Sequence, residues 1–188
     1  MAVSAGELFD INGRTAMISG GAGGIGAAIA EALAELGVAV AVLDVNDGAV
    51  RSTAESIRKA GGRALPIACD ITDGSQVADA AGCRDEYGSL NFLINCAGLS
   101  HIEATVDFDE KQWDRVMAVN LKGSFLLCQA AGRVMLDQNF GRIVNFSSVR
   151  GIQGRAGDPA YAPSKGAINQ LTRSLAIEWA TGGINVNA

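Results

Sequence analysis

The chain has 188 residues, enough for one domain with a sizeable core. Its hydrophobic fraction of 48% and charged fraction of 19% are those of a globular protein rather than a disordered one. A net charge of −5 argues against nucleic acid as a partner, because phosphate binding needs clustered Lys and Arg. No apolar run is long enough to span a bilayer, and residues 1–14 lack the pattern of a secretory signal. We therefore expect a cytoplasmic protein without a membrane partner.

Short apolar runs alternate with longer amphipathic segments along the chain. The apolar runs predict strands at 15–19, 39–43, 64–68, 92–96 and 142–147, with a sixth beginning at 184. The amphipathic segments predict helices at 25–36, 49–60, 73–87, 110–138 and 161–180. Strand and helix in alternation indicate parallel strands joined by crossovers. We expect a single α/β domain over residues 1–188, a doubly wound parallel sheet with helices on both faces.

A glycine-rich loop joins the first predicted strand to the first predicted helix. It runs Ser19, Gly20, Gly21, Ala22, Gly23, Gly24, Ile25, Gly26. Glycines in this position let the backbone turn tightly and approach a pyrophosphate, and the helix N-terminus offers free N–H groups to it. The loop lacks the Gly-Lys-Ser/Thr ending of a P-loop nucleotidase. It predicts a Rossmann-type dinucleotide site.

Asp44 ends the second predicted strand, about 20 residues after the glycines. A carboxylate there can accept hydrogen bonds from the adenosine ribose hydroxyls, and it would repel a 2′-phosphate. The glycine loop contains no Lys or Arg, and Val45 rather than Arg follows the acid. The sequence therefore favours NAD(H) over NADP(H).

A Tyr-Lys pair opens the last predicted helix. Tyr161 and Lys165 are four residues apart, so they share a helix face. A free phenol has a pKa of about 10, and a neighbouring ammonium favours its phenolate, which suits it to proton transfer. Ser148 follows the fifth strand, at the carboxyl end of the sheet, where its hydroxyl can bond the reacting oxygen.

The cysteines and the single histidine offer little sign of a metal site. The four cysteines contain no C-x-x-C pair and are expected to be buried core thiols in a reducing compartment: Cys69, Cys83, Cys96 and Cys128. With one His and scattered Cys, no metal is expected.

Together these motifs resemble the classical short-chain dehydrogenase/reductase family along essentially the whole chain. The matching positions are Ser19, Gly20, Gly24 and Gly26, Asp70 after the third strand, Asn95-Cys96-Ala97-Gly98, Asn120, Ser148, and Tyr161 with Lys165. Two positions depart from the family pattern, Ser19 for the usual Thr and Cys96 for the usual second Asn. Family members also continue past residue 188 into a lid and a final strand, so we expect a partial record of a longer protein whose sheet lacks its last strand or strands.

The resemblance implies a role for each matching residue. Tyr161 is the general acid/base, Lys165 lowers its pKa and holds the nicotinamide ribose, and Ser148 orients the substrate oxygen. Asn120 anchors a water in a proton relay. Asp70 and Ile71 contact adenine, and the segment with Asn95, Ala97 and Gly98 lines the cofactor. The resemblance further implies a homotetramer, or a dimer, through the helices at 110–138 and 161–180.

The expected activity is hydride transfer between NAD(H) and a small secondary alcohol or ketone. Residues 171–180 resemble family members that act on polyols, sugars and sugar acids, which gives a weak preference for a polyol, sugar or hydroxy acid. Substrate identity is expected to depend mainly on the region past residue 188 and on two loops, 99–107 with His101 and 149–159 with Arg150 and Arg155. The two arginines could pair with a carboxylate or phosphate of the substrate, but an incidental histidine and solvated arginines are the alternative. Two alternatives stay open. One is a 3-oxoacyl thioester reductase using NADPH, and the other is a catalytically silent dinucleotide-binding module, if the chain ends at Ala188.

Overall fold

A computed structural model describes residues 9–188. The sequence analysis predicted that residues 1–14 carry no secretory signal, and residues 1–8 of that stretch lie outside the described part. The chain forms a six-stranded sheet in the order β3-β2-β1-β4-β5-β6, and every pairing is parallel. The strands are β1 (Thr15–Ser19), β2 (Ala39–Asp44), β3 (Arg63–Ala68), β4 (Phe92–Asn95), β5 (Gly141–Asn145) and β6 (Ile184–Asn187). The predicted doubly wound parallel sheet is confirmed.

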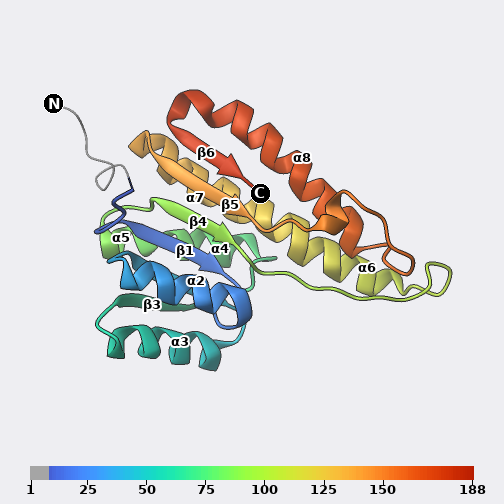
Figure 1. The fold of residues 1–188 in the computed structure, drawn as a ribbon, viewed down its shortest axis with the longest axis horizontal. Helices are drawn as coiled ribbons and strands as arrows, with labels where there is room; N and C mark the ends of the chain where they lie inside the picture. The colour runs from blue at the N-terminus through green and yellow to red at the C-terminus, as the bar shows by residue number, and fades with distance from the viewer. Residues whose placement is uncertain (1–8) are drawn as a thin grey trace.

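The strand order reverses between β1 and β4. The chain first builds outward from β1 to β2 and β3, then returns to place β4, β5 and β6 on the other side (Figure 1). The crossovers from β1 and from β4 therefore diverge, and a crevice opens above the carboxyl ends of these two strands. Ser19, at the end of β1, pairs with Asn95, at the end of β4, and marks this switch point.

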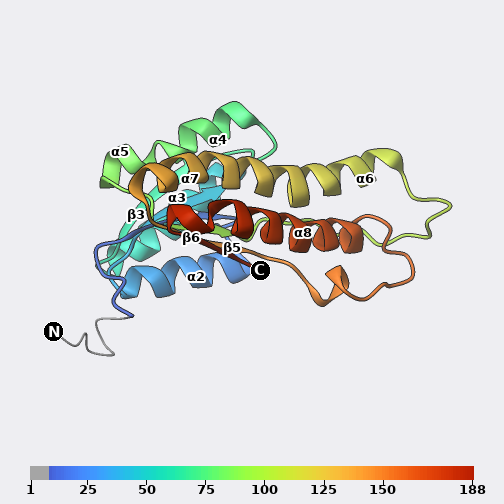
Figure 2. The ribbon, with the colours of Figure 1, turned by 90° about the horizontal axis from the view of Figure 1, so that it is seen from above.

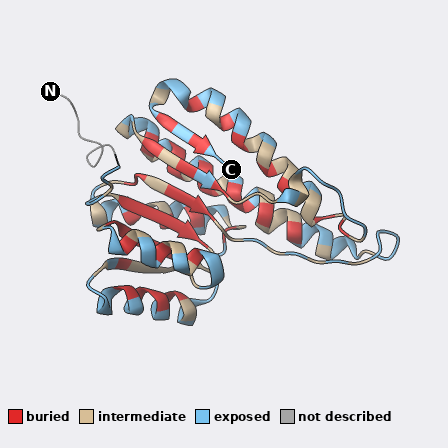
Figure 3. Cartoon of the chain, viewed as in Figure 1, coloured by how far each residue is buried: buried red, intermediate tan, exposed pale blue. Residues whose placement is uncertain are grey.

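Helices cover both faces of the sheet (Figure 2). The main helices are α2 (Gly24–Glu35), α3 (Asp47–Lys59), α4 (Gly74–Ala81), α5 (Cys83–Tyr87), α6 (Glu110–Met117), α7 (Ser124–Gln138) and α8 (Tyr161–Trp179). Side chains of α2 and α3 pack with those of β1 and β2 in one core, and α4, α7 and α8 bury a second core on the opposite face. The central strand β1 is buried along its whole length, as Figure 3 shows, which explains the apolar residues 16–18 at its centre.

The single helix predicted at 73–87 is wrong. The structure has two helices, α4 and α5, divided at Gly82. The Gly82 N–H bonds the carbonyl of Asp79, three residues back, and the Gly82 carbonyl accepts from Asp85. This tighter turn redirects the chain, and glycine at the division weakens continuation of the first helix.

The long helix predicted at 110–138 is present but not regular. A π-helical segment, Ala118–Gly123, separates α6 from α7. Such a segment adds a residue to the turn and is frequent at functional sites. It contains Asn120, one of the predicted catalytic residues.

The four cysteines are free thiols, three of them buried and Cys96 partly exposed. Burial raises the pKa of Cys83 to about 11, and that of Cys128 to about 12. Among residues 9–188, each helix falls short of the length or the apolar character that crossing a bilayer requires.

Candidate active site

A cavity of about 630 Å³ opens above the switch point of the sheet. Ten residues predicted to bind a dinucleotide line it: Gly20, Gly23, Ile25, Gly26, Asp44, Val45, Asp70, Ile71, Ala97 and Gly98. These residues come from the ends of β1, β2, β3 and β4, so the fold brings together positions spread over eighty residues of sequence. Cys96, inside the segment 95–98 that was expected to line the cofactor, also lines the cavity. The lining residues that the sequence analysis did not assign to it are Cys69, Thr72, Leu99, Arg115, Ala118 and Val119.

The glycines of the loop have two different roles. Gly20 has a φ of +66°, and a side chain there would lie 2.8 Å from the backbone nitrogen of Ala97. At Gly26 an added Cβ would overlap the carbonyl oxygen of Gly20. These two glycines are required by the close approach of backbone to backbone.

Gly23 and Gly24 instead face open space, because an added Cβ would meet no atom within 4 Å. Gly23 also precedes the first turn of α2, whose amides receive no side-chain cap. The loop is thus a shallow cradle of backbone N–H groups at a helix N-terminus, the arrangement that binds a pyrophosphate. Its residues fit a dinucleotide.

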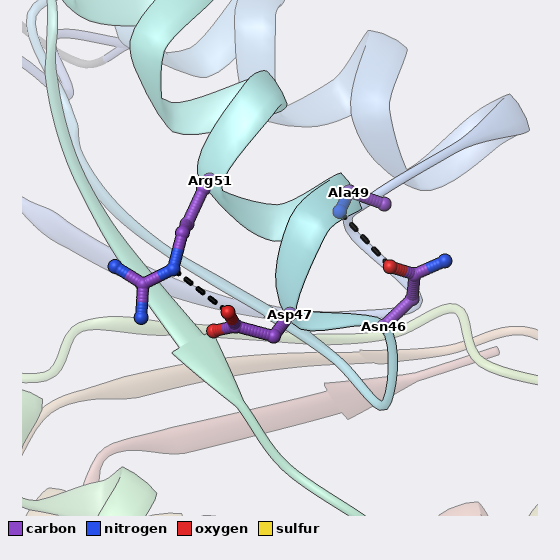
Figure 4. Close-up of polar contacts among 4 residues, drawn as sticks. All are labelled: Asn46, Asp47, Ala49 and Arg51. Carbon is purple, nitrogen blue, oxygen red and sulfur yellow. Dashed lines mark hydrogen bonds and ion pairs between the residues drawn. The ribbon is translucent and has the colours of Figure 1, made fainter.

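The loop after β2 presents a carboxylate and few free cations. The Asp44 Oδ1 accepts the Asn46 N–H at 3.1 Å, and the Asn46 side chain caps α3 by accepting the Ala49 N–H at 3.1 Å. The neighbouring cation, Arg51, is engaged with Asp47, its Nε 2.8 Å from the carboxylate (Figure 4). This hydrogen bond to Arg51 lowers the pKa of Asp47.

The loop after β3 is held against the helix that contains Asn120. The Asp70 carboxylate accepts hydrogen bonds from the backbone N–H and the hydroxyl of Thr72, at 2.9 and 2.8 Å. The Lys122 ammonium donates to the Thr72 carbonyl at 3.0 Å, and the Ile71 side chain packs directly on Gly123. Asp70 and Ile71 are thereby fixed at the rim of the cavity.

Tyr161 and Lys165 lie on the first turns of α8, at the carboxyl end of the sheet. The Lys165 Nζ lies 5.6 Å from the centroid of the Tyr161 ring and donates to the Phe146 carbonyl at 2.5 Å. Lys165 is only 5% exposed, and this burial lowers the pKa of its ammonium. An ammonium that is buried and anchored to backbone beside a phenol can stabilise the phenolate.

Asn120 is buried, and its side-chain amide makes three hydrogen bonds. The Oδ1 accepts the Leu99 N–H at 2.7 Å, and the Nδ2 donates to the Leu99 carbonyl and to the Ser164 hydroxyl, at 2.9 and 3.0 Å. Ser164 in turn donates to the Tyr161 carbonyl at 2.6 Å. Asn120 therefore ties the end of β4 to the helix of Tyr161. The backbone carbonyl of Asn120 accepts the Ser124 hydroxyl at 2.9 Å.

Ser148 follows β5 and caps the short 3₁₀ turn Val149–Gly151. Its Oγ accepts the Arg150 N–H at 3.1 Å, which leaves the hydroxyl proton free to be donated. The adjacent Ser147 donates to the carbonyl of Lys165 at 3.1 Å and fixes this loop to α8.

The predicted catalytic residues do not themselves line the cavity of the glycine loop: Asn120, Ser148, Tyr161 and Lys165. Gly98 connects the two regions. A Cβ added at Gly98 would lie 3.5 Å from Asn120 Oδ1 and 3.7 Å from Lys165 Nζ.

The profile of the short chain dehydrogenase family matches residues 14–188. This chain belongs to that family. It is 44% identical over 174 residues to the short-chain reductase protein NovJ of Streptomyces niveus, which covers 92% of this chain and 66% of NovJ. The chain thus spans about two thirds of this relative's length.

Two solved short-chain dehydrogenase structures are also similar. An NAD⁺-bound xylitol dehydrogenase matches with a TM-score of 0.92 and 37% identity, over 94% of this chain and 69% of that one. A metagenomic short-chain oxidoreductase in complex with NADP matches with a TM-score of 0.89 and 33% identity, over 93% of this chain and 80% of that one. The family thus includes structures solved with NAD⁺ and with NADP, and their sequence identities to this chain are similar.

Three predicted cofactor residues of this short-chain dehydrogenase serve the scaffold beneath the cavity. Ser19 Oγ accepts the Ala97 N–H at 3.4 Å, so the hydroxyl retained in place of Thr links β1 to the end of β4. Asn95 donates to Asn145 at 2.8 Å and to the Cys128 sulfur at 3.3 Å. Gly21 is buried below the loop, where an added Cβ would lie 3.0 Å from the Ile18 carbonyl oxygen.

The predicted substrate loops have internal structure of their own. His101 bonds Glu103 at 3.1 Å and packs edge-on against Phe108, with ring centroids 5.2 Å apart. The Arg150 guanidinium donates to the Gly154 carbonyl at 3.4 Å. Within residues 9–188, no group of three or more His, Cys, Asp or Glu is placed to hold a metal ion.

Proposed function

We propose that this short-chain dehydrogenase interconverts a small secondary alcohol and its ketone with NAD(H). The observation that carries the proposal is the pairing of a phenol with a buried, backbone-anchored ammonium, next to a cavity shaped for a dinucleotide. The glycine cradle and Asp70 hold the cofactor at one end, and Gly98 lies between it and the catalytic groups.

The nicotinamide supplies or accepts the hydride when the cofactor is bound. In the oxidising direction, the Ser148 hydroxyl donates a hydrogen bond to the substrate oxygen and so orients it. The phenolate of Tyr161 takes the alcohol proton as the C–H bond gives up its hydride, so a ketone is released. In reduction the Tyr161 hydroxyl returns that proton to the new alcohol oxygen. Lys165 favours the phenolate, and Asn120 keeps the start of α8 in place.

We propose NAD(H) rather than NADP(H) because the ribose end of the cavity presents an acid and no uncommitted cation on α3. Asp44 faces the cavity with the exposed apolar Val45 beside it. Arg51, on the exposed face of α3, is paired with Asp47 and does not line the cavity. A thioester reductase using NADPH is the alternative that a cofactor comparison separates, and the similar NADP complex keeps this comparison necessary.

The substrate class that we favour is a polyol, sugar or hydroxy acid. The similarity to a xylitol dehydrogenase supports a polyol. We also propose a cytoplasmic homotetramer, or a dimer, through the long helices. In its support, α7 and α8 expose the large apolar side chains Phe125 and Ile177.

The experiment that tests this function is oxidation of a panel of polyols, sugars and hydroxy acids with NAD⁺, followed at 340 nm. The full-length protein and Tyr161→Phe are compared at equal cofactor saturation. We expect turnover of at least one class by the parent protein and none by the variant. NADPH-dependent reduction of a 3-oxoacyl thioester, with no alcohol oxidised by NAD⁺, would contradict the proposal.

A further inference from the structure

Arg115 is the one basic residue among those that line the dinucleotide cavity, where the acidic side chains are Asp44 and Asp70. It belongs to α6, and its side chain is exposed. Among the described residues 9–188, its guanidinium makes no hydrogen bond or ion pair with another side chain or with backbone. A free, planar cation thus faces a ligand site.

The structure fixes the side of α6 from which Arg115 projects. Trp113, two residues earlier, points to the opposite side of the helix, where its Nε1–H donates to the Pro159 carbonyl at 3.2 Å. This bond ties α6 to the segment before α8 and restrains rotation of the helix about its own axis. Val119 follows Arg115 by one turn and also lines the cavity.

The neighbours of this helix face place Arg115 at the adenine end. Lys122 holds the Thr72 carbonyl, and Gly123 contacts Ile71, so the loop that carries Asp70 rests on the same helical surface. The glycine cradle lines the same cavity from the start of α2. Arg115 lies about two helical turns before Lys122 and lines the cavity together with Asp70 and Ile71.

We propose that Arg115 stacks its guanidinium on the exposed face of the adenine ring and so adds to the selection of an adenine dinucleotide. A guanidinium is flat and weakly hydrated, and it stacks well on an aromatic face, whereas Lys offers only a point charge. Lys122 cannot share this role, since its ammonium is committed to the Thr72 carbonyl. The inference rests on the proposed binding of a dinucleotide.

The test measures Kd by calorimetry for ADP-ribose, which contains adenine, and for reduced nicotinamide mononucleotide, which does not. Arg115→Ala, Arg115→Lys and the control Arg84→Ala are compared with the parent. Arg84 is exposed on α5 and does not line the cavity, so the control removes the same charge elsewhere. We expect Arg115→Ala to weaken ADP-ribose by about three- to tenfold, with Arg115→Lys recovering little of the loss. The control and the mononucleotide affinity stay unchanged.

Several outcomes would overturn the inference. ADP-ribose affinity within twofold of the parent in Arg115→Ala would refute stacking while the proposed function stands. Full rescue by lysine would show that Arg115 acts as a charge toward phosphate instead. Absence of ADP-ribose binding to the parent protein would refute the proposed function, and the inference with it.

Discussion

Two glycines of the same loop are expected to respond oppositely to the same added methyl group. In Gly26→Ala the new Cβ overlaps the Gly20 carbonyl oxygen and lies 2.8 Å from the Gly20 carbonyl carbon. Backbone cannot move aside as a flexible side chain can, so the first turn of α2 must separate from the loop. Overpacking of this kind costs about 2 kcal/mol or more in the free energy of unfolding. In a domain of this size that lowers Tm by about 4–8 °C.

In Gly23→Ala the methyl group meets no atom within 4 Å. The backbone there is extended, with φ −168° and ψ 171°, which any residue adopts. The unfolding free energy should change by less than about 1 kcal/mol. In the proposed binding mode the methyl group takes up space that the pyrophosphate needs, so Kd for NADH should rise about tenfold or more, a loss of about 1.4 kcal/mol.

The assay is urea unfolding followed by circular dichroism, without cofactor, together with calorimetric titration of NADH into each variant. Gly26→Ala with the stability of the parent would mean that the loop and helix do not meet as described. Gly23→Ala with unchanged NADH affinity would show that the pyrophosphate does not rest on this loop.

Four further changes test other parts of the account. Tyr161→Phe should abolish turnover while NADH binds within about twofold of the parent, and normal turnover would remove the phenol from proton transfer. Asp44→Ala should lower the preference for NAD⁺, which is kcat/KM with NAD⁺ divided by kcat/KM with NADP⁺, by about tenfold or more, and an unchanged preference would place ribose recognition elsewhere. Burial raises the pKa of Cys83 to about 11 from its ordinary 9.0, so the unfolded chain loses this proton first and stability falls as pH rises from 9 to 11. By pH 10 the parent should lose about 1.4 kcal/mol more than Cys83→Ala in urea unfolding, and parallel pH profiles would contradict burial of that thiol. Ile177→Glu, at a residue 80% exposed on α8, should lower the sedimentation mass of the assembly, and an unchanged mass would exclude this helix face from the interface.

The local signals of the sequence were enough for most of the fold and for the glycine loop. The strand at 15–19 is found with the predicted bounds, because a strand buried on both faces has consecutive apolar residues at its centre, here 16–18. The pairing of Tyr161 with Lys165 was equally predictable, since a spacing of four fixes a shared helix face.

What the sequence could not show depends on contacts between distant segments. The π-helical turn at Asn120 is associated with hydrogen bonds to Leu99 and Ser164, 21 and 44 residues away, which no helical periodicity contains. Arg115 carries no motif at all, and it reaches the cavity only through the direction in which α6 is held. Thr72 and Val119 adjoin predicted residues, Ile71 and Asn120, and extending each motif by one residue would have found them.

The most direct test of the central claim is a calorimetric titration of the purified protein with NADH and, separately, with NADPH. We predict a single class of sites that binds NADH more tightly than NADPH by about tenfold or more, since a 2′-phosphate would face Asp44. Tighter binding of NADPH, or no binding of either, would contradict the assignment of this cavity to NAD(H).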